Sequence, residues 1–154
     1  MLNVGDAAPT TGFALVDGGR GSVGDYVGQL LVVYFYPKDD TTGCTREAQD
    51  FTAFAADFAK VGTKVVGISK DSVKSHAKFT GKYDLSIILG SDEDGSVCEA
   101  FGTWVEKSMY GRTYMGIERA TFLIDAQGKI ARIWRKVKVA GHAADVLEAA
   151  RALG

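Results

Sequence analysis

An unbroken run of β-branched and aromatic residues, Leu30–Tyr36, ends at Pro37. Its apolar character is continuous rather than alternating, which is typical of a strand that is covered on both faces. Such a strand needs packed elements on each side, so this segment favours an α/β architecture around a central sheet. The chain has 154 residues. This is the usual length of one domain, here expected to span 1–154 and large enough for a substantial core.

Strand and helix patterns alternate along the rest of the chain, and no repeat or linker divides it. Before the central run, Phe13–Val16 has the pattern of a strand that enters a glycine-rich hairpin. After it we expect a helix over 45–60, a strand over 64–69, a helix from 71 or 72 to 83, a strand over 87–89, a short helix opened by Ser91 and Asp94 and ending at 101, strands over 119–125 and 130–137, and a last helix over 143–153.

This order predicts an α/β fold with three layers, α/β/α, a mixed central sheet and an N-terminal β-hairpin. A thioredoxin-like sheet fits the order, and so do other α/β folds. The helix over 45–60 is amphipathic, with its apolar side formed by Ala48, Phe51, Ala55 and Phe58. Its charged residues are expected on the opposite side: Arg46, Glu47, Asp50, Asp57 and Lys60.

Composition narrows the class of protein. The net charge is −1, so no global field draws the chain to nucleic acid or to a membrane surface. The N-terminus lacks the pattern of a signal peptide, and no apolar run approaches the roughly 20 residues of a membrane helix. Two cysteines do not make a disulfide scaffold. We therefore expect a soluble, cytoplasmic monomer.

Several patterns are explained more simply by local structure. The segment 19–24 matches G-x-G-x-x-G, but no helix follows it, so a hairpin is favoured over a dinucleotide site. Val97 and Thr103 stand where a calcium loop starting at Asp92 needs Gly and Glu, so a capped helix start is favoured there. The basic stretch 132–138 is expected at a solvated sheet edge. The scattered His and Cys residues do not predict a zinc site.

Cys44 stands where the central strand has ended and a helix begins. This carboxyl edge of the sheet is where α/β folds place their sites. The N–H groups and the dipole at a helix N-terminus favour an anion and hence a thiolate, the nucleophilic form of cysteine. Ala48 and Phe51 continue the buried stripe, so the sulfur should face inward. A small packing residue would occupy the same place, and position alone leaves both interpretations open.

The residues around Cys44 resemble a known family. Pro37, Thr41 and Cys44 match the peroxiredoxin motif Pro-x3-Thr-x2-Cys. Because position 41 is Thr, no C-x-x-C is present, which disfavours a dithiol–disulfide exchange site. Further segments resemble the bacterioferritin-comigratory-protein branch, also called peroxiredoxin Q, and run through nearly the whole chain: Val4–Pro9, Tyr34–Asp39, Gly43–Glu47, Gly111–Gly116 and Arg119–Asp125.

The resemblance implies a thioredoxin-like fold and a thiol peroxidase that needs no metal, haem or flavin cofactor. Cys44 matches the peroxidatic cysteine, and Thr41 the residue whose hydroxyl contacts the thiolate and the peroxide. Pro37 matches the proline that forms a wall of the pocket. Arg119 matches the arginine that holds the peroxide, and Glu47 is similar to the acidic residue that orients this arginine. The implied substrates are hydrogen peroxide and small organic hydroperoxides, and the implied reductant is thioredoxin or a similar dithiol.

The chain departs from this branch at one position. Many members carry a second cysteine five residues after the first, where this chain has Gln49. Cys98 is the other candidate for resolving a Cys44 sulfenic acid, and its neighbours allow it to point outward or along the sheet edge. Packing is the competing role for Cys98, and a one-cysteine enzyme is then the alternative.

Two other classes of function remain open at this point. One is a thioredoxin-like binding or holdase module in which Cys44 is an inert buried thiol. The other is a cysteine hydrolase in which the fold brings His76 or His142 to Cys44.

Overall fold

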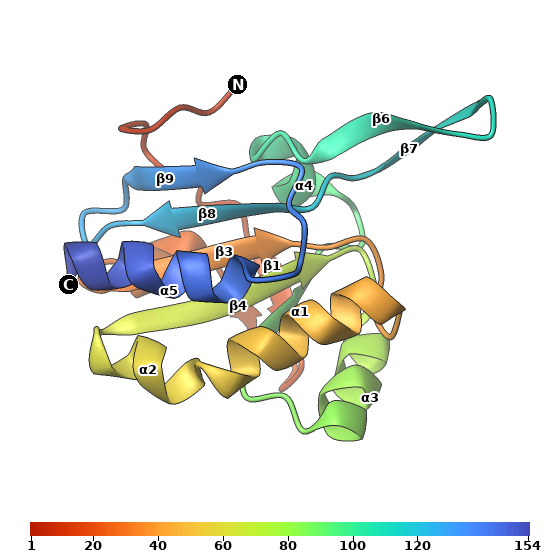
Figure 1. The fold of residues 1–154 in the computed structure, drawn as a ribbon. Helices are drawn as coiled ribbons and strands as arrows, with labels where there is room; N and C mark the ends of the chain where they lie inside the picture. The colour runs from red at the N-terminus through yellow and green to blue at the C-terminus, as the bar shows by residue number, and fades with distance from the viewer.

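The computed structural model describes residues 1–154 and contains one large sheet with helices packed on it (Figure 1). The strands are β1 (Phe13–Leu15), β2 (Arg20–Gly21), β3 (Leu30–Phe35), β4 (Thr63–Ser69), β5 (Ile88–Ser91), β6 (Trp104–Met109), β7 (Arg112–Ile117), β8 (Ala120–Ile124) and β9 (Ile130–Trp134). The helices are the 3-10 helix η1 (Val23–Tyr26), α1 (Thr42–Ala53), α2 (Ala55–Lys60), α3 (Val73–Tyr83), α4 (Ser96–Ala100) and α5 (His142–Leu153).

The large sheet has seven strands in the order β2-β1-β5-β4-β3-β8-β9. Strands β3, β4 and β5 are parallel, whereas β8 and β9 on one side and β1 and β2 on the other are antiparallel to their neighbours. The expected α/β fold with a mixed sheet and an N-terminal hairpin is confirmed. None of the helices is long and apolar enough to cross a membrane.

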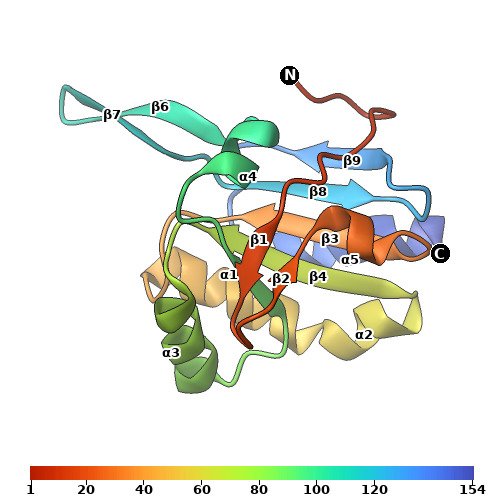
Figure 2. The ribbon, with the colours of Figure 1, turned by 180° about the vertical axis from the view of Figure 1, so that it is seen from behind.

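The central strand β3 is buried along its whole length, as its continuous apolar run predicts. Because successive side chains of a strand point to opposite faces, β3 contributes side chains to two separate hydrophobic cores. Leu30, Val32 and Tyr34 pack in one cluster with α1, α2 and α5, which lie in front of the sheet in Figure 1. Leu31, Val33 and Phe35 pack in the other with α4 and the N-terminal segment, which the rear view shows (Figure 2).

Two elements differ from the sequence-based expectation. The helix expected over 45–60 starts earlier, at Thr42, and is interrupted at Phe54, so it forms α1 and α2. The hairpin β6–β7 was not predicted and extends away from the sheet (Figures 1 and 2). Its strands are mostly exposed or half-buried, so the sequence lacks an apolar alternation there. Its turn is made by Tyr110 and Gly111, both with positive φ.

Local structure explains the weaker sequence patterns. Residues 19–24 form the end of the hairpin β1–β2 and the start of η1, so no helix long enough for a dinucleotide site follows them. The acidic segment starts a helix, and the Asp94 carboxylate accepts a hydrogen bond from the backbone N–H of Ser96 there. Asp92, and not Ser91, makes the other contacts at this helix start. Its carboxylate accepts hydrogen bonds from the backbone N–H groups of Val97 and Cys98. The basic stretch begins on β9, the edge strand, and continues past the end of that strand at Trp134.

One edge of the sheet collects several chain segments. The carboxyl ends of β3, β4 and β5 meet there, since Phe35 pairs with Ile68 and Ile68 with Gly90. The start of β8 lies at the same edge because Ala120 pairs with Phe35. Residues that follow β3 and residues that precede β8 are therefore neighbours in space.

Candidate active site

Cys44 lies in the first turn of α1, the helix that follows β3. The residue is buried, in the core cluster on the α1 face of the sheet. Thr41 is the N-cap residue, and the first backbone N–H groups of α1 have no partner within the helix. The sulfur therefore lies at the positive end of the helix dipole, as the sequence predicted.

A guanidinium faces this sulfur. Arg119 lies between β7 and β8, and its Nη2 donates a hydrogen bond to Cys44 Sγ at 3.3 Å. Its Nη1 donates to Glu47 Oε1 at 2.6 Å, so the fork of donors bridges the sulfur and a carboxylate. The structure thus brings Cys44, Arg119 and Glu47 together from segments far apart in the sequence. Gly43 lies beside Arg119, since a Cβ at this position would be in van der Waals contact with Nη2 at 3.4 Å.

Glu47 lies in the core, with a side chain 1% exposed, and not on the polar side of the helix. The expectation of a solvated Glu47 was wrong because the residue follows Cys44 by three positions and so shares its buried stripe. Burial raises the pKa of Glu47 to about 7, although Arg119 opposes the rise. Burial lowers the pKa of Arg119, but Glu47 and Cys44 outweigh it and the net shift is upward.

The raised pKa of Glu47 makes stability depend on pH. The folded state keeps the proton up to a pH of about 7, whereas the unfolded chain loses it near 4.5. Unfolding in this window releases a proton, so the free energy of unfolding should fall as the pH rises from about 4.5 to 7, by roughly 1–3 kcal/mol. Urea unfolding of the wild type and Glu47→Gln across this window measures the effect. An equal pH dependence in both proteins would contradict it.

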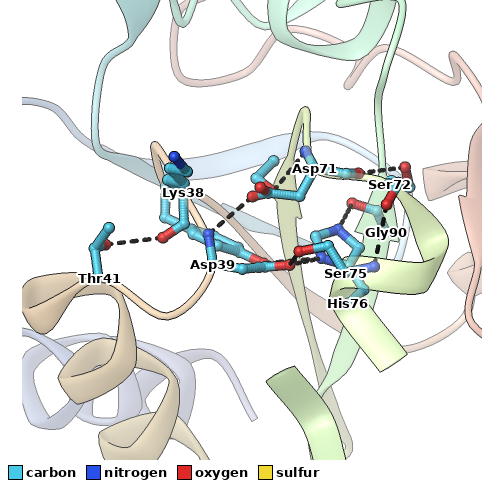
Figure 3. A network of polar contacts seen from close by, with 11 residues as sticks. Lys38, Asp39, Thr41, Asp71, Ser72, Ser75, His76 and Gly90 are labelled. Carbon is cyan, nitrogen blue, oxygen red and sulfur yellow. Dashed lines mark hydrogen bonds and ion pairs between the residues drawn. The ribbon is translucent and has the colours of Figure 1, made fainter. Parts of the chain in front are cut away.

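Thr41 and Pro37 lie in the exposed loop between β3 and α1. The Thr41 hydroxyl donates to the backbone carbonyl of Lys38 at 2.8 Å (Figure 3). Its proton is therefore engaged, and the oxygen is left with lone pairs that can accept a hydrogen bond. No hydrogen bond joins Thr41 to Cys44 in this structure. Pro37 follows the buried Tyr36 at the point where the chain emerges from the core.

Cys98 lies on the other face of the sheet from Cys44. It is fully buried in α4, in the cluster that contains Val33 and Phe35, and both cysteines are free thiols. The suggestion that Cys98 points outward or along the edge was wrong, because α4 packs its Cys98 side onto the sheet. Burial raises the pKa of Cys98 far above its ordinary value, and the hydrogen bond and negative charge of Asp92 raise it further.

Neither histidine forms a hydrogen bond with Cys44. His142 Nε2 is 2.7 Å from the Thr121 hydroxyl, and burial lowers its pKa to about 4. His76 is fully buried and contacts Asp39 and the backbone carbonyl of Gly90. The Cys–His pair that a cysteine hydrolase requires is therefore absent from this site.

Asp39, Asp71 and His76 form the one cluster whose geometry could suit a metal ion, with their ligand atoms within 4.8 Å of one another. These atoms already have hydrogen-bonding partners in the protein. His76 bonds Asp39, and the Asp71 carboxylate accepts from Ser69 and from the backbone N–H of Asp39. The cluster therefore forms a satisfied polar network, which sequence reasoning missed. One signal was present: His76 precedes Phe79 by three positions, on the buried stripe of α3.

Comparison with known proteins gives a consistent result. The AhpC/TSA family matches residues 4–133. A putative peroxiredoxin bcp of Coxiella burnetii is 48% identical over 146 residues, which cover 95% of this chain and 97% of that protein. Peroxiredoxin Bcp of Bacillus subtilis is 42% identical over 147 residues, covering 96% and 94%.

Solved structures agree with these relatives. Xylella fastidiosa PrxQ matches with a TM-score of 0.94 and 40% identity over 99% of this chain and 97% of that one. The bacterioferritin comigratory protein of Xanthomonas campestris, studied in trapped intermediate and ligand complexes of alkyl peroxide reduction, matches with a TM-score of 0.90 and 44% identity over 96% and 98%. With the resemblance around Cys44 confirmed along the chain, this protein belongs to the AhpC/TSA family of peroxiredoxins, in its Bcp or peroxiredoxin Q branch.

Proposed function

We propose that this peroxiredoxin reduces hydrogen peroxide and small organic hydroperoxides, with Cys44 as the nucleophile. The observation that carries the proposal is the hydrogen bond from Arg119 to a buried cysteine sulfur at a helix N-terminus. A fixed positive charge and unpaired N–H groups there favour the thiolate. The alkyl peroxide reduction studied in the Xanthomonas campestris relative supports this substrate class.

The reaction needs only groups that the site contains. The Cys44 thiolate attacks one peroxide oxygen, the S–O bond forms as the O–O bond breaks, and the leaving oxygen departs as hydroxide or alkoxide and takes a proton. The products are a sulfenic acid and water or an alcohol. Arg119 donates toward the oxygen on which charge develops, and the free lone pairs of Thr41 accept from the peroxide O–H. Glu47 holds Arg119 in place, and Pro37 limits access of water at the loop.

We propose that an external thiol, from thioredoxin or a similar dithiol, reduces the sulfenic acid. The thiol condenses with Cys44–SOH to a mixed disulfide and water, and a second thiol releases Cys44 and a disulfide of the reductant. The burial of Cys98 on the opposite face supports this route. A disulfide needs Cα atoms about 4.4–6.8 Å apart, and the sheet separates the cores that hold Cys44 and Cys98, so this bond would require a rearrangement of the fold.

Replacement of Cys98 tests the route. Cys98→Ser should retain the steady-state peroxidase rate of the wild type, because the buried thiol takes no part in turnover. The measurement is peroxide consumption with a dithiol reductant, after the variant is shown to be folded by circular dichroism. Accumulation of a Cys44 sulfenic acid in the variant but not in the wild type would instead assign resolution to Cys98.

The assay that tests the function itself follows hydroperoxide consumption by the whole chain with excess dithiol. We expect turnover with hydrogen peroxide and with small alkyl hydroperoxides. The kinetics should be ping-pong, in which water or an alcohol leaves the oxidised enzyme before the thiol reacts with it. A non-catalytic binding module would consume neither peroxide nor thiol above the background rate, and that result would overturn the proposal.

A further inference from the structure

A buried hydrogen-bonded pair, Asp39 and His76, lies beside the Cys44 loop and is not part of the contacts made by the sulfur. The Asp39 carboxylate accepts hydrogen bonds from Tyr36 at 2.6 Å, from Ser75 at 2.8 Å and from His76 Nδ1 at 2.7 Å (Figure 3). The side chains of His76 and Asp39 are 0% and 4% exposed. Buried polar groups need hydrogen-bonding partners, so this pairing constrains both residues.

Hydrogen bonds hold both sides of the His76 ring. Nε2 is 3.0 Å from the carbonyl oxygen of Gly90, which can only accept, so Nε2 donates to it. Nδ1 is 2.7 Å from Asp39 Oδ2, so a second hydrogen bond joins the ring to the carboxyl group. Asp39 is therefore held by Tyr36, Ser75 and His76 together.

The same residues hold the loop that leads to Cys44. The backbone N–H of Asp39 donates to Asp71 at 2.9 Å, which ties the loop to the end of β4. Asp40 has a φ of 59°, and its carboxylate is bound by Lys82 and Tyr83 of α3. Two consecutive loop residues, Asp39 and Asp40, are thus hydrogen-bonded to side chains of α3. They directly precede Thr41, the N-cap of α1. The position of Thr41 and of the α1 N-terminus therefore depends on contacts that never touch the sulfur.

We propose that Asp39 and His76 are positioning residues for peroxide reduction, which act by holding loop 37–41 so that Thr41 and the first turn of α1 meet the peroxide. The proposal rests on the function proposed for Cys44. The pair should therefore matter for the peroxide step, in which the bound substrate must be aligned, and not for the later reaction with a thiol.

A pair of substitutions at one position separates geometry from charge. Asp39→Ala removes every acceptor from the loop side of the network. In Asp39→Asn the amide can donate to Nδ1 of a neutral His76 and to Ser75, while its oxygen accepts from Tyr36, so all hydrogen bonds are preserved. Asp84→Asn, at the C-terminus of α3, is the matched control because it removes a carboxylate from the same helix without touching the loop.

The two half-reactions are measured separately, as kcat/KM for hydrogen peroxide and kcat/KM for the dithiol. We expect Asp39→Ala to lower the peroxide value at least about tenfold and to leave the thiol value unchanged. Asp39→Asn and the control should stay close to the wild type. An unchanged peroxide value in Asp39→Ala, or an equal fall in both values, would overturn the proposal, because loss of folded enzyme lowers both values alike.

Ser75→Ala keeps the proposal testable if Asp39→Ala does not fold, because it removes only one of the contacts that join Asp39 to α3. We expect it to lower the peroxide value and to leave the thiol value unchanged. An unchanged peroxide value, or an equal fall in both values, would overturn the proposal. If the wild type consumes no peroxide at all, the function proposed for Cys44 fails, whereas an active wild type with an unchanged variant overturns only the positioning role.

Discussion

Cys44→Ser should abolish peroxide turnover and leave the fold intact. A serine hydroxyl is not ionised at neutral pH and cannot form a sulfenic acid, so the nucleophile and the intermediate are lost together. The substitution is nearly isosteric in a buried position, and the surrounding cluster is otherwise unchanged. Steady-state consumption of hydrogen peroxide with excess dithiol should fall to the rate measured without enzyme.

The matched control is Cys98→Ser, the same chemical change in the other core. It should retain turnover, which shows that removal of one buried thiol does not by itself inactivate the protein. Full activity in Cys44→Ser would refute the assignment of the nucleophile. Loss of activity in both variants would mean that both sulfurs take part.

Arg119→Ala should slow the reaction with peroxide by about 10²–10³-fold, the usual loss when one donor to a developing oxyanion is removed. The guanidinium is the cation that contacts Sγ, and its second nitrogen anchors it on Glu47. Arg119→Lys should recover only part of the rate, because a single ammonium does not provide the planar fork that bridges sulfur and carboxylate. Rapid-mixing measurements with hydrogen peroxide in excess give the rate constant of this step directly.

Arg46→Ala is the control for the loss of an arginine from this region, since Arg46 lies exposed on α1 with a side chain 63% accessible. It should react at the wild-type rate. An Arg119→Ala variant that is folded and equally fast would remove the guanidinium from the mechanism. The alanine variant also leaves the Glu47 carboxylate buried without its partner, so its stability should be measured alongside.

The sequence was sufficient for the central strand and for Cys44 because both leave strong local signals. A continuous apolar run predicts a strand buried on two faces, and β3 is one. A cysteine that follows such a strand and stands at a helix start lies at the positive end of the helix dipole. This effect is local and does not depend on how the rest of the chain folds. The family motifs around Pro37, Thr41 and Arg119 predict the other residues of the site, and the fold brings Arg119 to Cys44.

Other features depend on tertiary contacts that leave no local pattern. The hairpin β6–β7 covers little apolar surface, so its strands do not alternate in hydrophobicity. Apolar residues keep the helical spacing on both sides of Phe54, so the sequence pattern does not reveal the interruption of the helix there. Glu47 and His76 are polar residues on buried stripes, and their burial is possible only because partners arrive from the segment between β7 and β8 and from the β3–α1 loop. A sequence pattern alone assigns such residues to the solvent.

The chemistry at Cys44 is tested most directly by mass analysis of the reduced protein after one equivalent of hydrogen peroxide, with rapid quenching and alkylation of free thiols. The expected result is the mass of one added oxygen atom on the peptide that contains Cys44, with Cys98 recovered as an alkylated thiol. A peptide with unmodified Cys44, while peroxide has been consumed, would contradict the proposed mechanism.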